Sequence, residues 1–93
     1  DSKYFPNIKR IWLFGSAAEN KMTLFSDIDI AVEFIAIDLK EATQFRIKVH
    51  VSEKIDLQVY NVLPEKIKKE IDEKGIVLYE KNKSFLPFQK RKF

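Results

Sequence analysis

The sequence predicts a small α/β domain with one mixed sheet and helices packed mainly on one face. The chain has 93 residues, 45% of them hydrophobic and 33% charged, which is the balance of a globular domain with one modest core. Segments that alternate with the two-residue period of β-strands are interleaved with segments that have helical spacing. Turn and helix-stop signals separate these segments, and such an interleaved order is typical of α/β architecture.

Four segments are predicted to be strands. Ile8–Phe14 is mostly apolar and ends at Gly15, as a buried strand does. Asp27–Phe34 and Lys54–Tyr60 alternate between apolar and polar side chains, so each is expected to have one buried face. Ile76–Tyr79 is expected to form a final short strand.

Helical segments are predicted between these strands. Residues 16–21 are expected to form a short helical turn with a serine as its N-cap. Residues 38–51 have an apolar stripe at helical spacing, with Asp38 as the N-cap. A second long helix is expected to begin near Pro64 and to stop at Gly75.

The chain is expected to consist of a domain over residues 1–80 and a basic, aromatic tail over residues 81–93. A solvated or partly disordered tail is the simplest interpretation, and contact with an acidic partner or with the domain's own sheet is the alternative; no direct nucleic-acid binding is expected. Because the chain has no cysteine, we expect neither disulfides nor a cysteine zinc site, and a cytoplasmic location. No membrane span or signal peptide is expected.

Two aspartates in the second predicted strand are candidate metal ligands. Asp27 and Asp29 are two residues apart, so in a strand both carboxylates lie on one face, roughly 6.5–7 Å apart. Like charges at this spacing repel each other, and a divalent cation such as Mg²⁺ or Mn²⁺ would compensate them. The alternative, which the pair alone does not exclude, is that Asp27 caps a turn and Asp29 is a solvated strand residue.

Two further features are consistent with a metal-dependent site. Asp56 lies on the polar face of its strand, so pairing of the two alternating strands would place three carboxylates on one face, as a two-metal site requires. Gly15 and Ser16 follow a buried strand, where free backbone N–H groups and a hydroxyl can bind a phosphate. Such a junction is also common as a plain turn.

The combined spacing resembles a known family. The pattern GS-x10-DxD, formed by Gly15, Ser16, Asp27 and Asp29, resembles the nucleotidyltransferases of the DNA polymerase beta superfamily, and in particular the small minimal nucleotidyltransferase (MNT) proteins. The segments IWLFGS, SDIDIAVEF, KIDLQVYNVLPEKIKKEI and EKGIVLYE extend the resemblance over residues 8–80.

The resemblance implies a fold, an activity and a partner. It implies a short mixed sheet with packed helices, metal ligation by Asp27, Asp29 and Asp56, and binding of the triphosphate by Ser16. Members of the family transfer a nucleoside monophosphate, commonly AMP from ATP, to an acceptor hydroxyl. Many resemble the MntA-like antitoxins of HEPN/MNT toxin–antitoxin pairs, whose acceptor is a tyrosine of the HEPN toxin. A hetero-oligomer with such a toxin is therefore expected, and Asp56 is the best candidate to take the proton of the acceptor hydroxyl.

The chain departs from the family pattern directly after Gly15-Ser16. The residues Ala17, Ala18, Glu19 and Asn20 stand where an aromatic residue or arginine, alanine, arginine and glycine are usual. Glu19 thus replaces an expected triphosphate contact, and Lys21 is the nearest substitute cation, although it lacks the fork of arginine. Asn20 can adopt the left-handed conformation of the missing glycine. The predicted nucleotide-binding residues are Gly15, Ser16 and Lys21.

Two alternatives to a fully active enzyme follow. One is an antitoxin with a weakened site that neutralises its partner by forming a complex. The other, a fragment of a larger transferase for small molecules, would need a substrate domain that 93 residues leave little room for. Trp12 is predicted to be a packing residue, Glu33 to have only a minor chance of contacting metal, and Tyr60 to be partly buried rather than to stack on a base.

Overall fold

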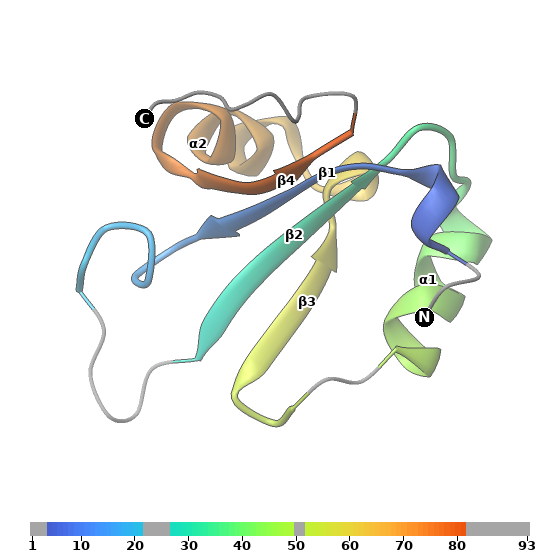
Figure 1. The fold of residues 1–93 in the computed structure, drawn as a ribbon, viewed down its shortest axis with the longest axis horizontal. Helices are drawn as coiled ribbons and strands as arrows, with labels where there is room; N and C mark the ends of the chain where they lie inside the picture. The colour runs from blue at the N-terminus through green and yellow to red at the C-terminus, as the bar shows by residue number, and fades with distance from the viewer. Residues whose placement is uncertain (1–3, 22–26, 50–51, 82–93) are drawn as a thin grey trace.

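A computed structural model of the protein describes residues 4–21, 27–49 and 52–81, which form a four-stranded sheet with two α-helices (Figure 1). The strand order is β3-β2-β1-β4. β1 (Ile8–Phe14) is antiparallel to both β2 (Ile28–Phe34) and β4 (Ile76–Glu80), whereas β3 (Ile55–Val59) runs parallel to β2. The predicted small mixed sheet and the α+β class are thus confirmed.

The parallel pairing of β2 and β3 requires a crossover, which α1 (Leu39–Lys48) provides. Asp38 is its N-cap, as predicted: the Asp38 side chain accepts a hydrogen bond from the backbone N–H of Glu41, and the Glu41 side chain accepts one from that of Asp38. The C-cap is Val49, so the helix ends before residues 50–51, which lie outside the described ranges.

α2 (Glu65–Lys74) has the predicted limits. Pro64 is its N-cap and Gly75 its C-cap, where the N–H of Gly75 donates to the carbonyl of Ile71. In the part of the chain that the structure describes, neither α1 nor α2 is long and apolar enough to cross a membrane.

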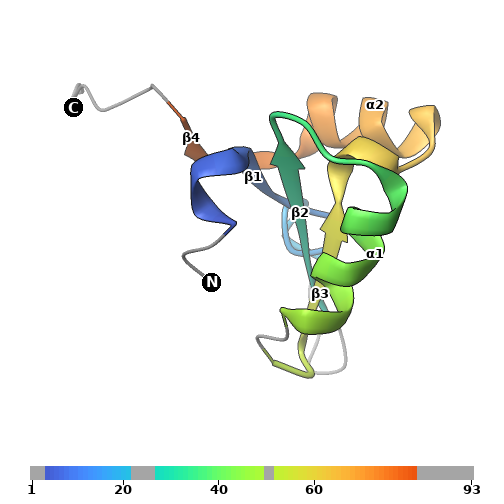
Figure 2. The same ribbon diagram turned by 90° about the vertical axis from the view of Figure 1, so that its right-hand side faces the viewer.

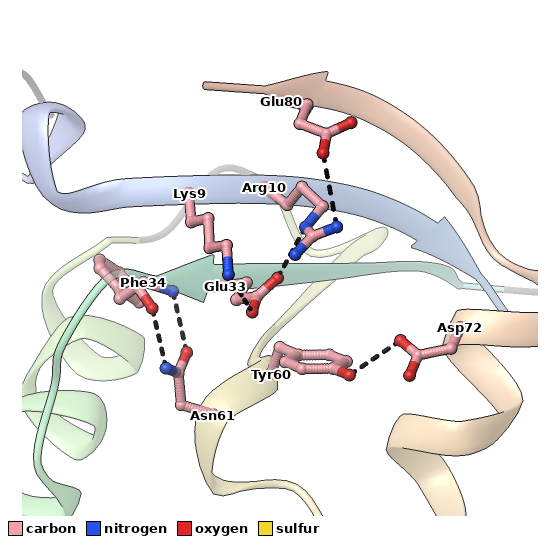
Figure 3. Close-up of polar contacts among 8 residues, drawn as sticks. All are labelled: Lys9, Arg10, Glu33, Phe34, Tyr60, Asn61, Asp72 and Glu80. Carbon is pink, nitrogen blue, oxygen red and sulfur yellow. Dashed lines mark hydrogen bonds and ion pairs between the residues drawn. The ribbon is translucent and has the colours of Figure 1, made fainter. Parts of the chain in front are cut away.

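Two short 3₁₀ segments, η1 (Phe5–Asn7) and η2 (Tyr60–Val62), complete the described elements. The alternating pattern had predicted that Tyr60 ends the preceding strand. In the structure Tyr60 is instead the first residue of η2. Asn61 in η2 binds both backbone groups of Phe34: its Oδ1 accepts from the N–H (2.8 Å) and its Nδ2 donates to the carbonyl (2.9 Å) (Figure 3). The amide side chain therefore continues the hydrogen bonding at the end of β2.

Residues 15–20 form consecutive turns, where a helical turn capped by Ser16 was expected. The bonds mix three lengths: Ala18 donates to the carbonyl of Gly15 three residues back, Glu19 donates to the same carbonyl four residues back, and Lys21 donates to that of Ser16 five residues back. Asn20 has φ +60°, so the prediction that it adopts the left-handed conformation is confirmed. A residue in this conformation interrupts the regular helical bonding.

The core consists of two clusters on opposite faces of the sheet. Val32 and Phe34 of β2 pack against Phe45 of α1, while Ala31, which points to the other face, packs with Trp12 and with Ile71 of α2. Figure 2 shows α1 covering the side of β2 and β3. The two helices therefore lie on opposite faces of the sheet, whereas the sequence had predicted helices mainly on one face. Trp12 is buried, as predicted.

A row of charged side chains crosses the sheet on the second face (Figure 3). Arg10 of β1 lies between Glu33 of β2 and Glu80 of β4, with Nε 2.9 Å from Glu33 Oε1 and an Nη 3.4 Å from Glu80 Oε2. A register shift between Ile8 and Arg10 accompanies this pairing, and Lys9 also lies 3.9 Å from Glu33. Glu33 is thus engaged by cations of β1.

Candidate functional site

The predicted acidic residues lie at neighbouring positions of two adjacent strands. Asp29 of β2 and Asp56 of β3 are register partners in the parallel pair, and side chains at such positions project from the same face. Asp27 lies just before β2, two residues from Asp29. The sequence-based expectation that β2 and β3 pair with these acids side by side is therefore confirmed for Asp29 and Asp56.

Gly15 lies directly against the Asp29 carboxylate. Phe14, the last residue of β1, is the register partner of Asp29, so the chain turns away from the sheet beside this side chain. Gly15 has φ +72°, and a Cβ atom at this position would overlap with Asp29 Oδ2. The glycine therefore provides both the turn and the space for the carboxylate.

The surroundings of Asp29 disfavour its ionised form. Partial burial raises the pKa of its carboxyl above the ordinary value, and the neighbouring charges of Asp56 and Asp27 raise it further. The negative charge at Asp29 is therefore undercompensated in the protein alone. A bound cation would relieve this repulsion.

Asp56 has two neighbours that sequence reasoning did not associate with it. Its Oδ2 accepts a hydrogen bond from Gln58 Nε2 at 2.9 Å, and its Oδ1 lies 3.9 Å from an Nη of Arg46 on α1. Gln58 could have been found, because it is two residues along the same alternating strand. Arg46 could not, because its approach depends on how α1 packs against the edge of β3.

The carboxylates have the chemistry of ligands for Mg²⁺ or Mn²⁺ but do not form a ready-made cage. Hard carboxylate oxygens and the raised pKa of Asp29 suit a divalent cation. Within residues 4–21, 27–49 and 52–81, however, no three acidic, histidine or cysteine side chains are grouped so that they could hold a metal ion. Ligation by Asp27, Asp29 and Asp56 together stays a prediction, and it requires Asp56 to exchange its present partners.

The turn after β1 carries the predicted phosphate-binding groups. Its internal hydrogen bonds use the N–H groups of residues 18–21 and not those of Ser16 and Ala17. Glu19 Oε1 lies 3.4 Å from Lys21 Nζ. The cation expected to replace the missing arginine is therefore paired with the acid that stands in the arginine's position.

Tyr60 has a structural role on the same face of the sheet. Its ring contacts Trp12, with centroids 4.5 Å apart, and its hydroxyl donates to Asp72 of α2 at 2.8 Å (Figure 3). Burial and this hydrogen bond raise the pKa of Tyr60 to about 12. The prediction of partial burial is confirmed.

Three solved structures have a similar fold. One is a toxin–antitoxin with AMP-PNP (TM-score 0.67, 23% identity, covering 87% of this chain and 68% of that chain). Another is the toxin–antitoxin MntA–HpeT carrying two Asp-to-Glu substitutions at positions two residues apart (TM-score 0.63, 20% identity, 87% and 67% covered). The third is a protein from Sulfolobus solfataricus proposed to be a nucleotidyltransferase (TM-score 0.64, 22% identity, 92% and 76% covered).

The sequence itself matches one family model over nearly its whole length. A search of curated proteins gave no significant match. The model described as "Polymerase beta, Nucleotidyltransferase" matches residues 2–84, a range that contains the turn after β1 and all three aspartates. Together with the fold, this match shows that the chain belongs to the polymerase beta nucleotidyltransferase family.

Proposed function

We propose that the protein transfers a nucleoside monophosphate, AMP from ATP, to a hydroxyl group of a partner protein. The observation that carries this proposal is the contact of Gly15 with the Asp29 carboxylate, beside Asp56 on the adjacent strand. This contact joins the phosphate-binding turn to the acidic pair, as transfer of a phosphoryl-type group requires.

Each part of the site has a separate task. The N–H groups of Ser16 and Ala17, which no backbone hydrogen bond among the described residues uses, hold the triphosphate at the end of β1 together with the Ser16 hydroxyl. The acceptor oxygen attacks the α-phosphorus, the bond to the β-phosphate oxygen breaks, and pyrophosphate leaves. Asp56, the half-buried carboxylate of the edge strand, takes the proton of the attacking hydroxyl.

Divalent metal is part of the proposal. Asp27 and Asp29 would hold it, joined by Asp56. Bound there, Mg²⁺ or Mn²⁺ supplies neutralisation of the triphosphate charge and orientation of the reacting oxygens. The substitution of two aspartates two residues apart in the MntA–HpeT structure has the same spacing as Asp27 and Asp29, which supports this assignment.

The acceptor that we propose is a tyrosine of a HEPN-type toxin, which the protein would neutralise as a cytoplasmic antitoxin. Two of the similar structures are toxin–antitoxins, and one of them is described with AMP-PNP. These likenesses support a protein acceptor over a small molecule. They also support a hetero-oligomer as the working form.

Label transfer tests the proposal. The protein, Mg²⁺ and ATP labelled on the α-phosphate are incubated with the co-expressed toxin, and transfer to the toxin is expected with the natural chain but not with Asp27→Asn. Transfer that is unchanged in Asp27→Asn would contradict the metal-ligand role. Neutralisation of the toxin by Asp27→Asn without label transfer would instead favour an antitoxin that acts by complex formation.

The ion pair between Glu19 and Lys21 favours this second candidate, because it lowers the positive charge available to the triphosphate. Glu19→Arg is expected to tighten ATP binding roughly tenfold, about 1.4 kcal/mol, since it adds a charge-assisted contact and frees Lys21. Calorimetry with ATP and Mg²⁺ measures this change. The control Glu19→Gln removes the ion pair without adding a guanidinium group and should give a smaller gain; an unchanged affinity in Glu19→Arg would contradict the expected contact.

A further inference from the structure

The structure has an apolar groove between α1 and the edge strand β3. Its volume is about 430 Å³, and its lining includes Leu39 and Ile47 from α1 and Ile55 and Leu57 from β3. Leu39 and Ile47 are 69% and 74% exposed. Large apolar side chains gathered around a concave surface mark a binding site more often than scattered ones do.

The groove is continuous with the candidate active site through Asp56. This residue lines the groove, and it is also the register partner of Asp29. Because β3 is the edge of the sheet, the side chain of Asp56 borders both the acidic pair and the groove. A molecule seated in the groove therefore lies next to the carboxylate that takes the acceptor proton.

The groove suits inserted side chains better than an added strand. Arg46 Nε donates to the carbonyl of Leu57 at 3.1 Å, so a backbone acceptor on the outer edge of β3 is already covered. Arg46 is also the one basic residue among those lining the groove in the described part of the chain. Its guanidinium lies 3.9 Å from the Asp56 carboxylate, which also lines the groove, so the apolar side chains are what the groove offers to an occupant.

We propose that this groove binds the segment of the acceptor protein that carries the modified hydroxyl, with a large apolar side chain of that segment inserted between α1 and β3. The proposal rests on the function proposed above. The insertion fixes the position of the neighbouring hydroxyl residue at Asp56. The hydroxyl oxygen then forms the new bond to the α-phosphorus, pyrophosphate departs, and the proton passes to the Asp56 carboxylate.

The test compares Ile47→Ser and the double variant Leu39→Ser/Ile47→Ser with Leu78→Ser. Leu78 is a matched control, since it is 55% exposed on β4, the opposite edge of the sheet. With the purified toxin as acceptor, KM is expected to rise about tenfold in Ile47→Ser and about a hundredfold in the double variant, since each serine removes one buried apolar side chain from the complex. The affinity for ATP should not change, and Leu78→Ser should behave as the natural chain.

Two readouts separate failure of the groove from failure of the proposed function. If the natural chain transfers label and the double variant has an unchanged KM, the groove proposal is overturned while the function stands. If no label is transferred, calorimetric binding of the toxin decides: weaker binding in the double variant supports the groove as the docking surface, and equal binding overturns it. If the isolated chain is a dimer that the double variant dissociates, a second copy occupies the groove and the proposal is wrong.

Discussion

Asp29→Asn is expected to abolish nucleotidyl transfer and to leave the fold as stable as before, or slightly more stable, at neutral pH. Transfer should fall by at least about 10³-fold, because a carboxylate that binds the metal contributes several kcal/mol of charge stabilisation. The fold should not suffer, since burial and the charges of Asp56 and Asp27 disfavour the ionised carboxylate. The repulsion among these carboxylates therefore favours a bound cation, and it lowers the stability of the protein when no cation is bound.

The stability effect has a defined pH dependence. The pKa of Asp29 is raised in the folded protein, so the folded state binds its proton more tightly than the unfolded state does. The contribution of this proton to the free energy of unfolding is fully present below the ordinary aspartate pKa, about 4. It is lost as the pH rises through the raised pKa of the folded protein. The advantage of Asp29→Asn should therefore appear above this window and vanish below it, and it should stay below ~1 kcal/mol because the site is partly exposed.

Urea unfolding at pH 7 and near pH 3, roughly one unit below the ordinary aspartate pKa, measures this difference, and a second series at pH 7 compares the proteins with and without Mn²⁺. The metal should raise the stability of the natural chain but not that of Asp29→Asn. The control Glu73→Gln, which removes an exposed carboxylate of α2, should change neither transfer nor the response to Mn²⁺. Full activity in Asp29→Asn, or an equal response to Mn²⁺, would contradict the assignment of Asp29.

Gly15→Ala is expected to lower both stability and transfer. The residue has φ +72°, and its new Cβ would overlap with Asp29 Oδ2, so the turn and the carboxylate cannot both keep their positions. We expect a loss of about 1–3 kcal/mol in the free energy of unfolding and at least a tenfold loss of transfer, because the displaced groups are those that we propose to bind the triphosphate and the metal.

A double-mutant cycle checks the cause. Gly15→Ala is introduced into both the natural chain and Asp29→Ala, and the free energy of unfolding is measured by urea denaturation. The cost should be smaller in the Asp29→Ala background, since the overlap is removed and only the left-handed backbone is penalised. Equal costs in both backgrounds would show that Gly15 and Asp29 are not coupled.

Local features of the fold followed from the sequence because short-range chemistry specifies them. Strict alternation located β2 and β3 to within a residue or two, and the Asp38 cap and the Gly75 stop located the ends of the helices. The left-handed Asn20 followed from the small amide side chain that tolerates this conformation.

Features that depend on distant packing did not follow. The shift in β1 that brings both Lys9 and Arg10 to Glu33 is invisible in a periodic pattern. The packing of α2 against Trp12, opposite α1, depends on the crossover and on the strand order. The ion pair between Arg46 and Asp56 and the groove between α1 and β3 likewise form only when α1 packs against the edge of the sheet.

The position of β3 has a consequence for how the candidate site is lost. Among the described residues, β3 pairs with β2 alone, whereas β1, β2 and β4 form a continuous antiparallel unit without it. Detachment of a single outer strand is a local opening and not global unfolding, so loss of the proposed site can be a separate event from loss of the fold. A partner that clamps the outer strand would raise the fraction of time during which the carboxylates stand together.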